Sequence, residues 1–308
     1  MVLQLLRRWF FVGRCGSALL SKGVLRGGVY LCCMKNLVTD RLTNQVYFSG
    51  YLTAFVCWRD LKPALQRAEV PFRMIPFTRD IWVRDFMPIQ ISDQRMVAFR
   101  YAPSYLADSR RFQTDPRKCI EAMGLEVIES DLVVDGGNVV KCDDCVLMTN
   151  RVLRENRRWR KAEVIEKLER ALDCEVVILP QDGAEEYGHA DGMVRYVGNN
   201  TVLLNHYVDF DPWLRTRLLK VLQPRFRVVE LHFDTARELA TSWAYLNYMQ
   251  VGERLFVPNY HSPLDEVAYL QLEEALGYPI EPIYCPTNVA MGGGLNCLSW
   301  TVREPVFL

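Results

Sequence analysis

The sequence predicts an α/β fold, because short β-branched segments alternate with segments whose apolar residues recur at helical spacing. From Met34 onward a strand, a hairpin and a helix follow one another several times, at intervals of about 50 residues. The hairpins exclude a purely parallel sheet, since only antiparallel strands can be joined by a tight turn. A ring of small units, each made of two strands and a helix, fits this order.

Strands are predicted where β-branched and other apolar residues cluster between turn residues. One pair of strands is joined by Gly198-Asn199-Asn200, which is typical of a hairpin turn. Pro180 closes one strand and Pro258 closes another, because proline cannot donate to a strand ladder. The predicted strands span residues 70–75, 96–100, 127–134, 176–179, 193–197, 201–204, 226–231 and 255–257.

Helices are predicted over residues 61–68, 162–172, 213–222 and 264–276. In the second of these, Ile165, Leu168 and Leu172 recur on one face. Pro224 stops the third helix, and Gly277 is a good C-terminal cap for the fourth.

Composition narrows the class of protein. The chain has 308 residues with 37 basic and 37 acidic side chains, and this balance argues against a nucleic-acid partner. No run of roughly 18 apolar residues predicts a membrane span. The 10 cysteines are scattered, which favours reduced thiols and a cytoplasmic location over a disulfide scaffold. Without any linker-like tract, residues 34–308 are predicted to form one domain.

The first 33 residues differ from the rest. They contain five basic residues and no acid, and they show little periodicity. A transit peptide is one interpretation. The one we favour is a disordered or non-native extension that precedes a natural start at Met34, so we exclude residues 1–33 from the predicted fold.

Four short segments concentrate reactive or charged residues, three of them together with glycine, and we expect the chemistry of the protein there. Three consecutive glycines precede Cys297, so its side chain is uncrowded and the backbone can approach a ligand closely. Cys297 is then either a nucleophile or a buried thiol at a tight bend. The segments are 78–88, Asp135-Gly136-Gly137-Asn138, Gly188-His189-Ala190-Asp191-Gly192 and Gly292-Gly293-Gly294-Leu295-Asn296-Cys297.

His189 and Asp191 are two residues apart, so an extended backbone would point both side chains into one site. The other three histidines have no comparable setting. A lone histidine is more often structural than catalytic, and both interpretations stay open on the sequence alone.

The acidic segment near residue 80 suits a planar cation. Trp82 lies among Asp80, Arg84 and Asp85, and a guanidinium stacks on aromatic rings while it pairs with carboxylates. A surface ion-pair set is the alternative. Asp135 is either a further member of the site or a turn acid.

Together the four segments, in this order, resemble the agmatine deiminase and bacterial-type peptidylarginine deiminase family of guanidine-modifying enzymes. The resemblance covers most of residues 40–303 and implies a pentein-type α/β propeller, a pseudo-fivefold ring of ββαβ-like units. It implies Cys297 as nucleophile, His189 as acid and base, and Asp85 and Asp191 as carboxylates that hold the guanidinium beside Trp82. The remaining candidates for substrate contacts are Arg84, Asp135, Asn138 and Gly294.

The sequence departs from the family pattern at three places. Met87 replaces the glycine of W-x-R-D-x-G-P, Asp135 replaces the glutamate of E-G-G, and Asn296 replaces the histidine before the nucleophile. The resemblance therefore predicts the reaction, a hydrolytic deimination without metal or organic cofactor, more sharply than the substrate. We expect a small-molecule guanidinium, first agmatine in a route to putrescine, then free or peptidyl arginine. Oligomeric state is not readable from the sequence.

Three other functions compete with this prediction. An amidinotransferase would use the same site with an amine in place of water. A guanidinium-binding protein without activity would have no need of the thiol. A zinc or redox site at Cys142-Asp143-Asp144-Cys145 lacks a second ligand pair, and a hairpin turn is the simpler interpretation of these residues.

Overall fold

The computed structural model describes residues 23–25, 28–30, 37–183, 187–234 and 242–305. The chain divides into two compact units, residues 1–36 and 37–308. In the first unit, β1 (Gly23–Leu25) pairs antiparallel with β2 (Gly28–Tyr30). Apart from these two strands, the prediction for residues 1–33 falls outside the described residues.

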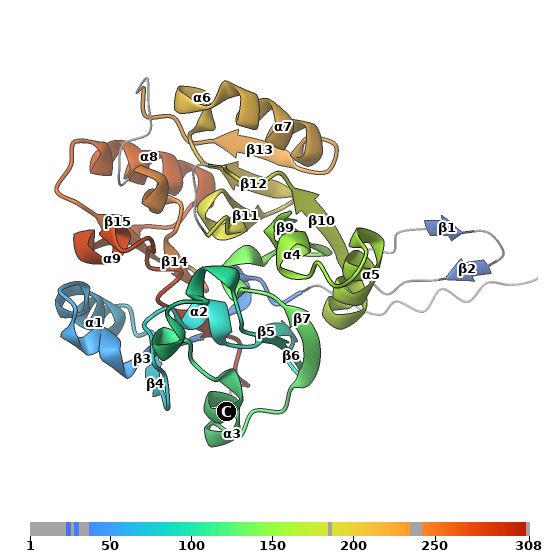
Figure 1. Cartoon of the computed structure of the whole chain (residues 1–308). Helices are drawn as coiled ribbons and strands as arrows, with labels where there is room; N and C mark the ends of the chain where they lie inside the picture. Colours follow the sequence, from blue (N-terminus) through green and yellow to red (C-terminus); the bar gives the residue numbers. More distant parts are fainter. Residues whose placement is uncertain (1–22, 26–27, 31–36, 184–186, 235–241, 306–308) are drawn as a thin grey trace, which may run out of the picture. The chain divides into compact units, whose positions relative to one another are not determined.

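Five three-stranded sheets with one common strand pattern form the second unit (Figure 1). In each sheet the middle strand pairs antiparallel with one neighbour and parallel with the other. The sheets are β17 (Trp300–Val302), β3 (Gln45–Ser49) and β4 (Phe72–Ile75); β5 (Ile89–Ser92), β6 (Arg95–Arg100) and β7 (Ile128–Val133); β8 (Val140–Lys141), β9 (Cys145–Thr149) and β10 (Glu175–Leu179); β11 (Val194–Gly198), β12 (Thr201–Leu204) and β13 (Arg227–Glu230); and β14 (Met249–Val251), β15 (Arg254–Asn259) and β16 (Ile280–Tyr284).

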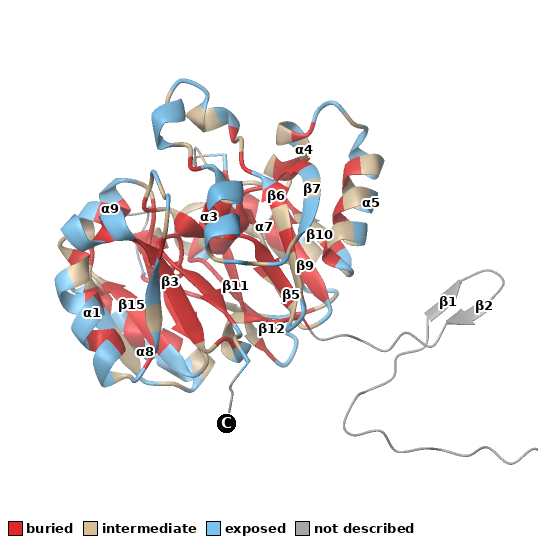
Figure 2. Ribbon diagram, turned by 90° about the horizontal axis from the view of Figure 1, so that it is seen from below, coloured by how far each residue is buried: buried red, intermediate tan, exposed pale blue. Residues whose placement is uncertain are grey.

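Helices provide the crossovers, because two parallel neighbours need a long connection. Along the chain, each of these helices follows the middle strand of a sheet and precedes its parallel neighbour. The outer face of the helices is exposed (Figure 2). These helices are α1 (Cys57–Arg67), α3 (Pro116–Ala122), α4 (Arg151–Glu155), α5 (Lys161–Leu172), α6 (Tyr207–Phe210), α7 (Pro212–Leu222) and α8 (Leu264–Leu276). Two more, α2 (Val83–Phe86) and α9 (Pro286–Ala290), instead follow β4 and β16 and carry the chain toward β5 and β17.

The first sheet joins the two ends of the second unit. β17 pairs with β3, with Trp300 opposite Tyr47, so the end of the chain completes the sheet that its beginning started. The Trp300 indole also donates to the Pro88 carbonyl at 2.8 Å, just beyond α2. This pairing fixes the segment before β17, which contains Cys297, against α2.

Buried apolar side chains form five clusters, and each cluster combines residues of two sheets. The clusters join the first and second sheets, the second and third, the third and fourth, the fourth and fifth, and the fifth and first. In the last of these, Phe48 of β3 and Phe256 of β15 are both fully buried. The core is thus distributed between the sheets, with no single central layer.

Most predicted elements are confirmed. The hairpin is observed as β11 and β12, and positive φ values at Asn199 and Asn200 give it the tight turn that the sequence predicted. The last predicted helix is α8, which ends where Gly277 adopts the left-handed conformation. The strand predicted to end at Pro258 continues one residue beyond it, since β15 runs to Asn259.

The buried face of α5 differs slightly from the predicted one. Leu168 and Leu172 are fully buried, as predicted, but Val164 completes the buried face in place of Ile165, which is half-buried. A spacing of four residues from Val164 to Leu168 keeps the face on one side of the helix.

Candidate active site

A cavity of about 130 Å³ brings together residues from four separate parts of the chain. It contains a thiol, an imidazole and two carboxylates, enclosed largely by aromatic side chains. The lining residues are Asp80, Trp82, Asp85, Tyr101, Tyr105, Leu106, Tyr187, His189, Met291, Gly292, Gly293 and Cys297.

Cys297 lies in the loop between α9 and β17 with an exposed fraction of 6%. Its thiol donates to Asp191 Oδ2 across 3.6 Å, and its backbone N–H donates to Asn247 Oδ1 at 3.3 Å. Burial, together with the charges of Asp191 and Asp85, raises the pKa of this thiol well above its ordinary value. The sulfur is therefore protonated at rest, and a cation beside it would favour the thiolate.

His189 is held between two carboxylates. Its Nε2 donates to Asp135 Oδ2 at 3.0 Å, and its Nδ1 lies 3.6 Å from Asp85 Oδ1. Burial alone would lower the pKa of His189, but the charge of Asp85 and the hydrogen bond to Asp135 outweigh it and raise the pKa to about 10. At neutral pH the ring is an imidazolium, which is a general acid.

Asp85 lies on α2 and accepts a hydrogen bond from the Gly137 N–H at 3.0 Å. Burial raises the pKa of Asp85 to about 7 although the His189 charge acts in the opposite direction, because the charges of Asp135 and Asp191 add to the effect of burial. A site with this much negative charge and little water is suited to a cationic ligand.

Gly137 lets these groups approach one another. A Cβ at this position would lie 2.7 Å from Asp85 Oδ1 and 2.7 Å from His189 Nδ1, which is too close for either atom to stay in place. The Gly136-Gly137 pair that the sequence singled out therefore provides space beside the acid and the imidazole.

The extended backbone expected around His189 and Asp191 is wrong. Residues Ala190–Gly192 form a 3-10 helix, and His189 is its N-cap. The turn separates the two side chains: His189 lines the cavity, whereas Asp191 is not among the lining residues and accepts from the Cys297 thiol and, at 2.6 Å, from Asn296 Nδ2. Local strand periodicity could not reveal this, because a single turn of helix leaves no pattern in the sequence.

Only some of the predicted site residues line the cavity. Trp82, Asp85, His189 and Cys297 line the cavity, and Asp135 and Asp191 contact His189 and Cys297 without lining it.

The other three predicted residues bind protein groups. Arg84 donates to the Asn296 carbonyl and to Thr301 Oγ1, both at 3.3 Å. Asn138 accepts from the Thr149 N–H at 2.8 Å. Gly294 packs against Asn247.

Aromatic residues that the sequence did not single out enclose the cavity. Tyr105 and Tyr187 meet edge to face with ring centroids 5.0 Å apart, and Tyr105 also donates to Asp135 Oδ2 at 3.2 Å. Gly293, also in the lining, lies so close to the Trp82 ring that a Cβ would come within 2.1 Å of it. Tyr105 lies in the 3-10 helix Ser104–Leu106 and Tyr187 lies outside any helix or strand, so no periodicity marks either residue in the sequence.

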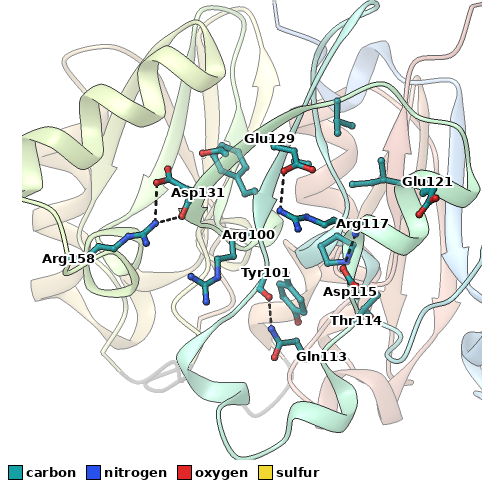
Figure 3. A pocket seen from close by; sticks show the side chains of 16 residues that line it. Arg100, Tyr101, Gln113, Thr114, Asp115, Arg117, Glu121, Glu129, Asp131 and Arg158 are labelled. Atoms are coloured by element: carbon teal, nitrogen blue, oxygen red, sulfur yellow. Dashed lines mark hydrogen bonds and ion pairs between the residues drawn. The ribbon is translucent and has the colours of Figure 1, made fainter.

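A larger cavity of about 710 Å³ lies beside α3, β6 and β7 (Figure 3). It contains no cysteine or histidine, and its acids include ones paired with arginine, as in Arg117 with Glu129 and Arg158 with Asp131. Tyr101 lines both cavities. The larger cavity lacks the groups that covalent chemistry on a guanidinium requires.

Within the described residues, no group of three or more His, Cys, Asp or Glu side chains is arranged to hold a metal ion. Cys142 and Cys145 lie at the hairpin between β8 and β9, where the Cys142 N–H donates to the Cys145 carbonyl at 2.8 Å. The hairpin interpretation of this segment is confirmed. In the described part of the chain, no helix combines the length and apolarity needed to cross a bilayer.

Solved structures share this fold at low sequence identity. The agmatine deiminase of C. jejuni with substrate bound superposes with a TM-score of 0.68 at 16% identity, covering 88% of this chain and 96% of that one. The agmatine deiminase of Enterococcus faecalis gives 0.68 at 17%, covering 88% and 97%. A DDAH of Pseudomonas aeruginosa gives 0.55 at 16%, covering 85% and 100%. Curated protein sequences give no significant match.

A match to a family model shows which protein family the chain belongs to. The model of the Porphyromonas-type peptidyl-arginine deiminase matches residues 38–302, which is most of the chain and contains all four segments that the sequence singled out. The α/β fold, the shared architecture and this match agree. The chain therefore belongs to the Porphyromonas-type peptidyl-arginine deiminase family, whose members are hydrolases of C–N bonds in guanidinium groups.

Proposed function

We propose that this protein hydrolyses the guanidinium group of agmatine, giving N-carbamoylputrescine and ammonia. The observation that carries the proposal is the single cavity in which Cys297, His189 and Asp85 meet, with Asp191 in contact with the thiol. Such a set supplies a nucleophile, an acid and base, and anionic groups for a flat cation.

Binding prepares the nucleophile. Asp85 and Asp191 hold the guanidinium nitrogens and orient the central carbon toward the sulfur of Cys297. The positive charge of the substrate offsets the carboxylates that keep the thiol protonated, so the thiolate forms when the substrate is bound. Trp82 stacks on the planar group from one side.

The first chemical step exchanges nitrogen for sulfur. The thiolate attacks the guanidinium carbon and a C–S bond forms, giving a tetrahedral intermediate. The His189 imidazolium gives its proton to the departing nitrogen, the C–N bond breaks, and ammonia leaves. The product on the enzyme is an S-alkylthiouronium cation on Cys297.

The second step exchanges sulfur for oxygen. Neutral His189 removes one proton from water, the oxygen attacks the thiouronium carbon, and the C–S bond breaks to release the Cys297 thiolate. The thiolate takes up the second proton of the water and returns to the resting thiol. The ureido product leaves, and His189 keeps the proton that restores the imidazolium. No cofactor takes part in either step.

The lining of the cavity favours agmatine over arginine. Among the described residues that line it there is no lysine or arginine, so a substrate carboxylate has no basic partner. Asp80 lies in the lining, and its carboxylate suits the terminal ammonium of agmatine. The shared architecture with solved agmatine deiminases supports the same choice.

A ureido assay tests the proposal. Ureido product and ammonia are measured for agmatine, free arginine, and C-terminal and internal peptidyl arginine, with and without an added amine. We expect kcat/KM to be highest for agmatine and ammonia release to need no amine. A peptide as the best substrate would overturn agmatine, release only with an amine would indicate an amidinotransferase, and no turnover with intact agmatine binding would indicate a binding protein.

We also infer that the five sheets form a closed pseudo-fivefold ring, an α/β propeller. The support is the cyclic order of the apolar clusters, in which the fifth sheet packs on the first through Phe256 and Phe48. An experimental structure of residues 37–308 in which these two sheets lie apart would contradict the ring.

A further inference from the structure

Asn247 is a fully buried residue that bonds to the nucleophile loop through two groups, its side-chain oxygen and its carbonyl. It follows the 3-10 helix Ser242–Tyr245, and its own N–H donates to the Ala244 carbonyl at 3.0 Å. Its Oδ1 accepts from the Cys297 N–H at 3.3 Å, and its carbonyl accepts from the Asn296 N–H at 3.0 Å. These contacts hold the Asn247 side chain in one orientation against the sulfur-bearing residue.

The Nδ2 group of Asn247 differs from the other polar groups of this residue in its hydrogen bonding. It is buried, and within the described structure it has no hydrogen-bond partner. An unpaired buried donor normally destabilises a fold. We therefore expect Nδ2 to have a hydrogen-bond partner at another stage of the reaction. The Asn247 side chain lies beside the Cys297 thiol, and its amide acts to lower the pKa of that thiol.

The other groups around the thiol are charged. Burial and the charges of Asp191 and Asp85 favour the protonated form, whereas Arg84 acts in the opposite direction. Arg195, which is buried, also interacts with Cys297 and Asp191. Asn247 is the neutral donor in this set, so its effect on the sulfur does not depend on pH.

The contact between Asn247 and the nucleophile loop requires a residue without a side chain at position 294. A Cβ at residue 294 would lie 2.7 Å from Asn247 Oδ1 and 2.8 Å from both its Cβ and its carbonyl oxygen. Any side chain at this position would push Asn247 away from the loop. Gly294, the last of the three glycines before the nucleophile, therefore makes room for the asparagine.

The helix before Asn247 is anchored in turn. Ser242 Oγ lies 2.9 Å from His206 Nε2, and His206 Nδ1 lies 3.2 Å from Asp209 Oδ2. This Ser-His-Asp arrangement is buried, and none of its members lines a cavity described above. Its role is to fix the segment that carries Asn247.

We propose that Asn247 is a positioning residue for Cys297, which fixes the backbone of the nucleophile through Oδ1 and donates from Nδ2 to the sulfur whenever it is a thiolate. The thiol proton leaves toward Asp191 Oδ2, and the sulfur then accepts from Nδ2 in its place. The same donor stabilises the thiolate that departs when water cleaves the thiouronium. This role rests on the proposed function of Cys297 as nucleophile.

The test compares Asn247→Asp and Asn247→Ala in the full chain. Asn247→Asp keeps the acceptor for the Cys297 N–H and removes the Nδ2 donor, whereas Asn247→Ala removes both. Asn156→Ala is the matched control, because Asn156 is a buried asparagine whose amide is fully bonded to Val133 and Val152. Circular dichroism first establishes that each variant is folded.

The first measurement is the rate at which iodoacetamide alkylates Cys297, followed across pH by mass spectrometry of its peptide. We expect both Asn247 variants to react roughly tenfold to a hundredfold more slowly near neutral pH and to need a higher pH for full reactivity, as for the loss of a hydrogen bond to a charged group. Asn156→Ala should keep the wild-type profile. Unchanged profiles in folded Asn247 variants would overturn the proposal.

The second measurement separates this proposal from the proposed function. With the substrate identified by the ureido assay, Asn247→Asp should lower kcat by a similar factor and leave KM within about twofold. If the alkylation profiles shift while the wild-type protein deiminates nothing, the role of Asn247 stands and the proposed function fails. A rise in KM with kcat unchanged would contradict the role of Asn247.

Discussion

The Cys297 thiol lies among groups that oppose its ionisation. Asp191 and Asp85 raise its pKa together with burial, and the nearby His189 cation is engaged by Asp85 and Asp135. A site of this kind holds its nucleophile in the unreactive form until a cation arrives. Binding of a guanidinium would then both select the substrate and activate the thiol.

The first prediction concerns the pH dependence of turnover. Asp85 must be ionised to bind the substrate, and its pKa is raised to about 7; His189 must be protonated to release ammonia, and its pKa is raised to about 10. We expect kcat/KM to rise as pH increases through about 7 and to fall near 10, with both limbs belonging to the coupled site. A profile that falls steadily from pH 6 upward, roughly where an ordinary histidine titrates, would contradict these assignments.

The second prediction concerns stability. Because the pKa of Asp85 is higher in the folded protein than its ordinary value of 3.8, folding holds this proton more tightly, and the contribution of Asp85 to stability decreases as pH rises from about 4 to about 7. Asp85→Asn removes the titrating carboxyl and with it this pH-dependent loss of stability. Its free energy of unfolding relative to wild type should therefore increase across that range, by on the order of 1 kcal/mol or more.

Urea unfolding at several pH values measures this effect. The exposed Asp108 provides the control, and Asp108→Asn should follow the wild type at every pH. Asp85→Asn should also lower kcat/KM by at least about tenfold, because one anionic contact with the substrate is lost. A variant that is active and no more stable at pH 8 would show that Asp85 is an ordinary acid.

Among single residues, the sequence predicted which side chains share the cavity better than how they are arranged. Cys297 and His189, which both line it, were singled out because glycines surround a reactive side chain, which is a local signal. Tyr105 and Tyr187 could not be found, since the contact between them forms only when two short segments, far apart in the sequence, meet in the fold. Arg84 and Asn138, which the sequence offers as substrate contacts, form hydrogen bonds to Asn296, Thr301 and Thr149 that depend on the tertiary fold.

At the scale of the element, short turns position the chemistry. Asp85 sits on the four residues of α2, and His189 caps a single 3-10 turn. Neither element is long enough to be stable alone, so packing must hold them. The contact of the Arg84 N–H with the Cys297 carbonyl, at 3.2 Å, joins α2 to the nucleophile loop.

The third prediction tests the close approach at Gly137. Gly137→Ala places a Cβ against Asp85 and His189, so we expect kcat to fall by at least about tenfold and the protein to lose about 1–3 kcal/mol of stability. Gly50→Ala is the control, because a Cβ there meets nothing within 4 Å. Kinetics and thermal unfolding measure both effects, and wild-type kinetics in Gly137→Ala would refute the packing described for this position.

Long elements were predictable, whereas the short ones were not. α8 has 13 residues, so both its periodicity and its terminal Gly277 could be recognised in the sequence. β8 has 2 residues and β17 has 3, too few for a periodic signal. Their pairing is decided by distant partners, as when β17 pairs with β3.

At the scale of the molecule, the repeat of strand, hairpin and helix is realised as five sheets with one pattern. The sequence showed this repeat only through the order of its elements, because packing between sheets needs apolar residues of no particular identity. The pairing of the first and last strands adds a constraint that no local segment contains. It joins the nucleophile, near the end of the chain, to a sheet that starts at its beginning.

The fourth prediction concerns the first 33 residues. Residues 37–308 form a compact unit by themselves, and the family match begins at residue 38. A variant that starts at Met34 should therefore have the same Tm and the same kcat/KM as the full chain. Calorimetry and the ureido assay provide the comparison, and a clear loss of either quantity would show that the first segment belongs to the folded enzyme.

The proposed mechanism requires the sulfur of Cys297 to bond to the carbon of a guanidinium substrate. Mass spectrometry of acid-quenched mixtures of enzyme and agmatine examines that bond directly. We expect a thiouronium adduct on the Cys297 peptide and on no other cysteine, and neither adduct nor ammonia from Cys297→Ala, whose rate falls by at least about 10³-fold. Ammonia release at the wild-type rate from Cys297→Ala, or turnover in which Cys297 is never modified, would contradict it.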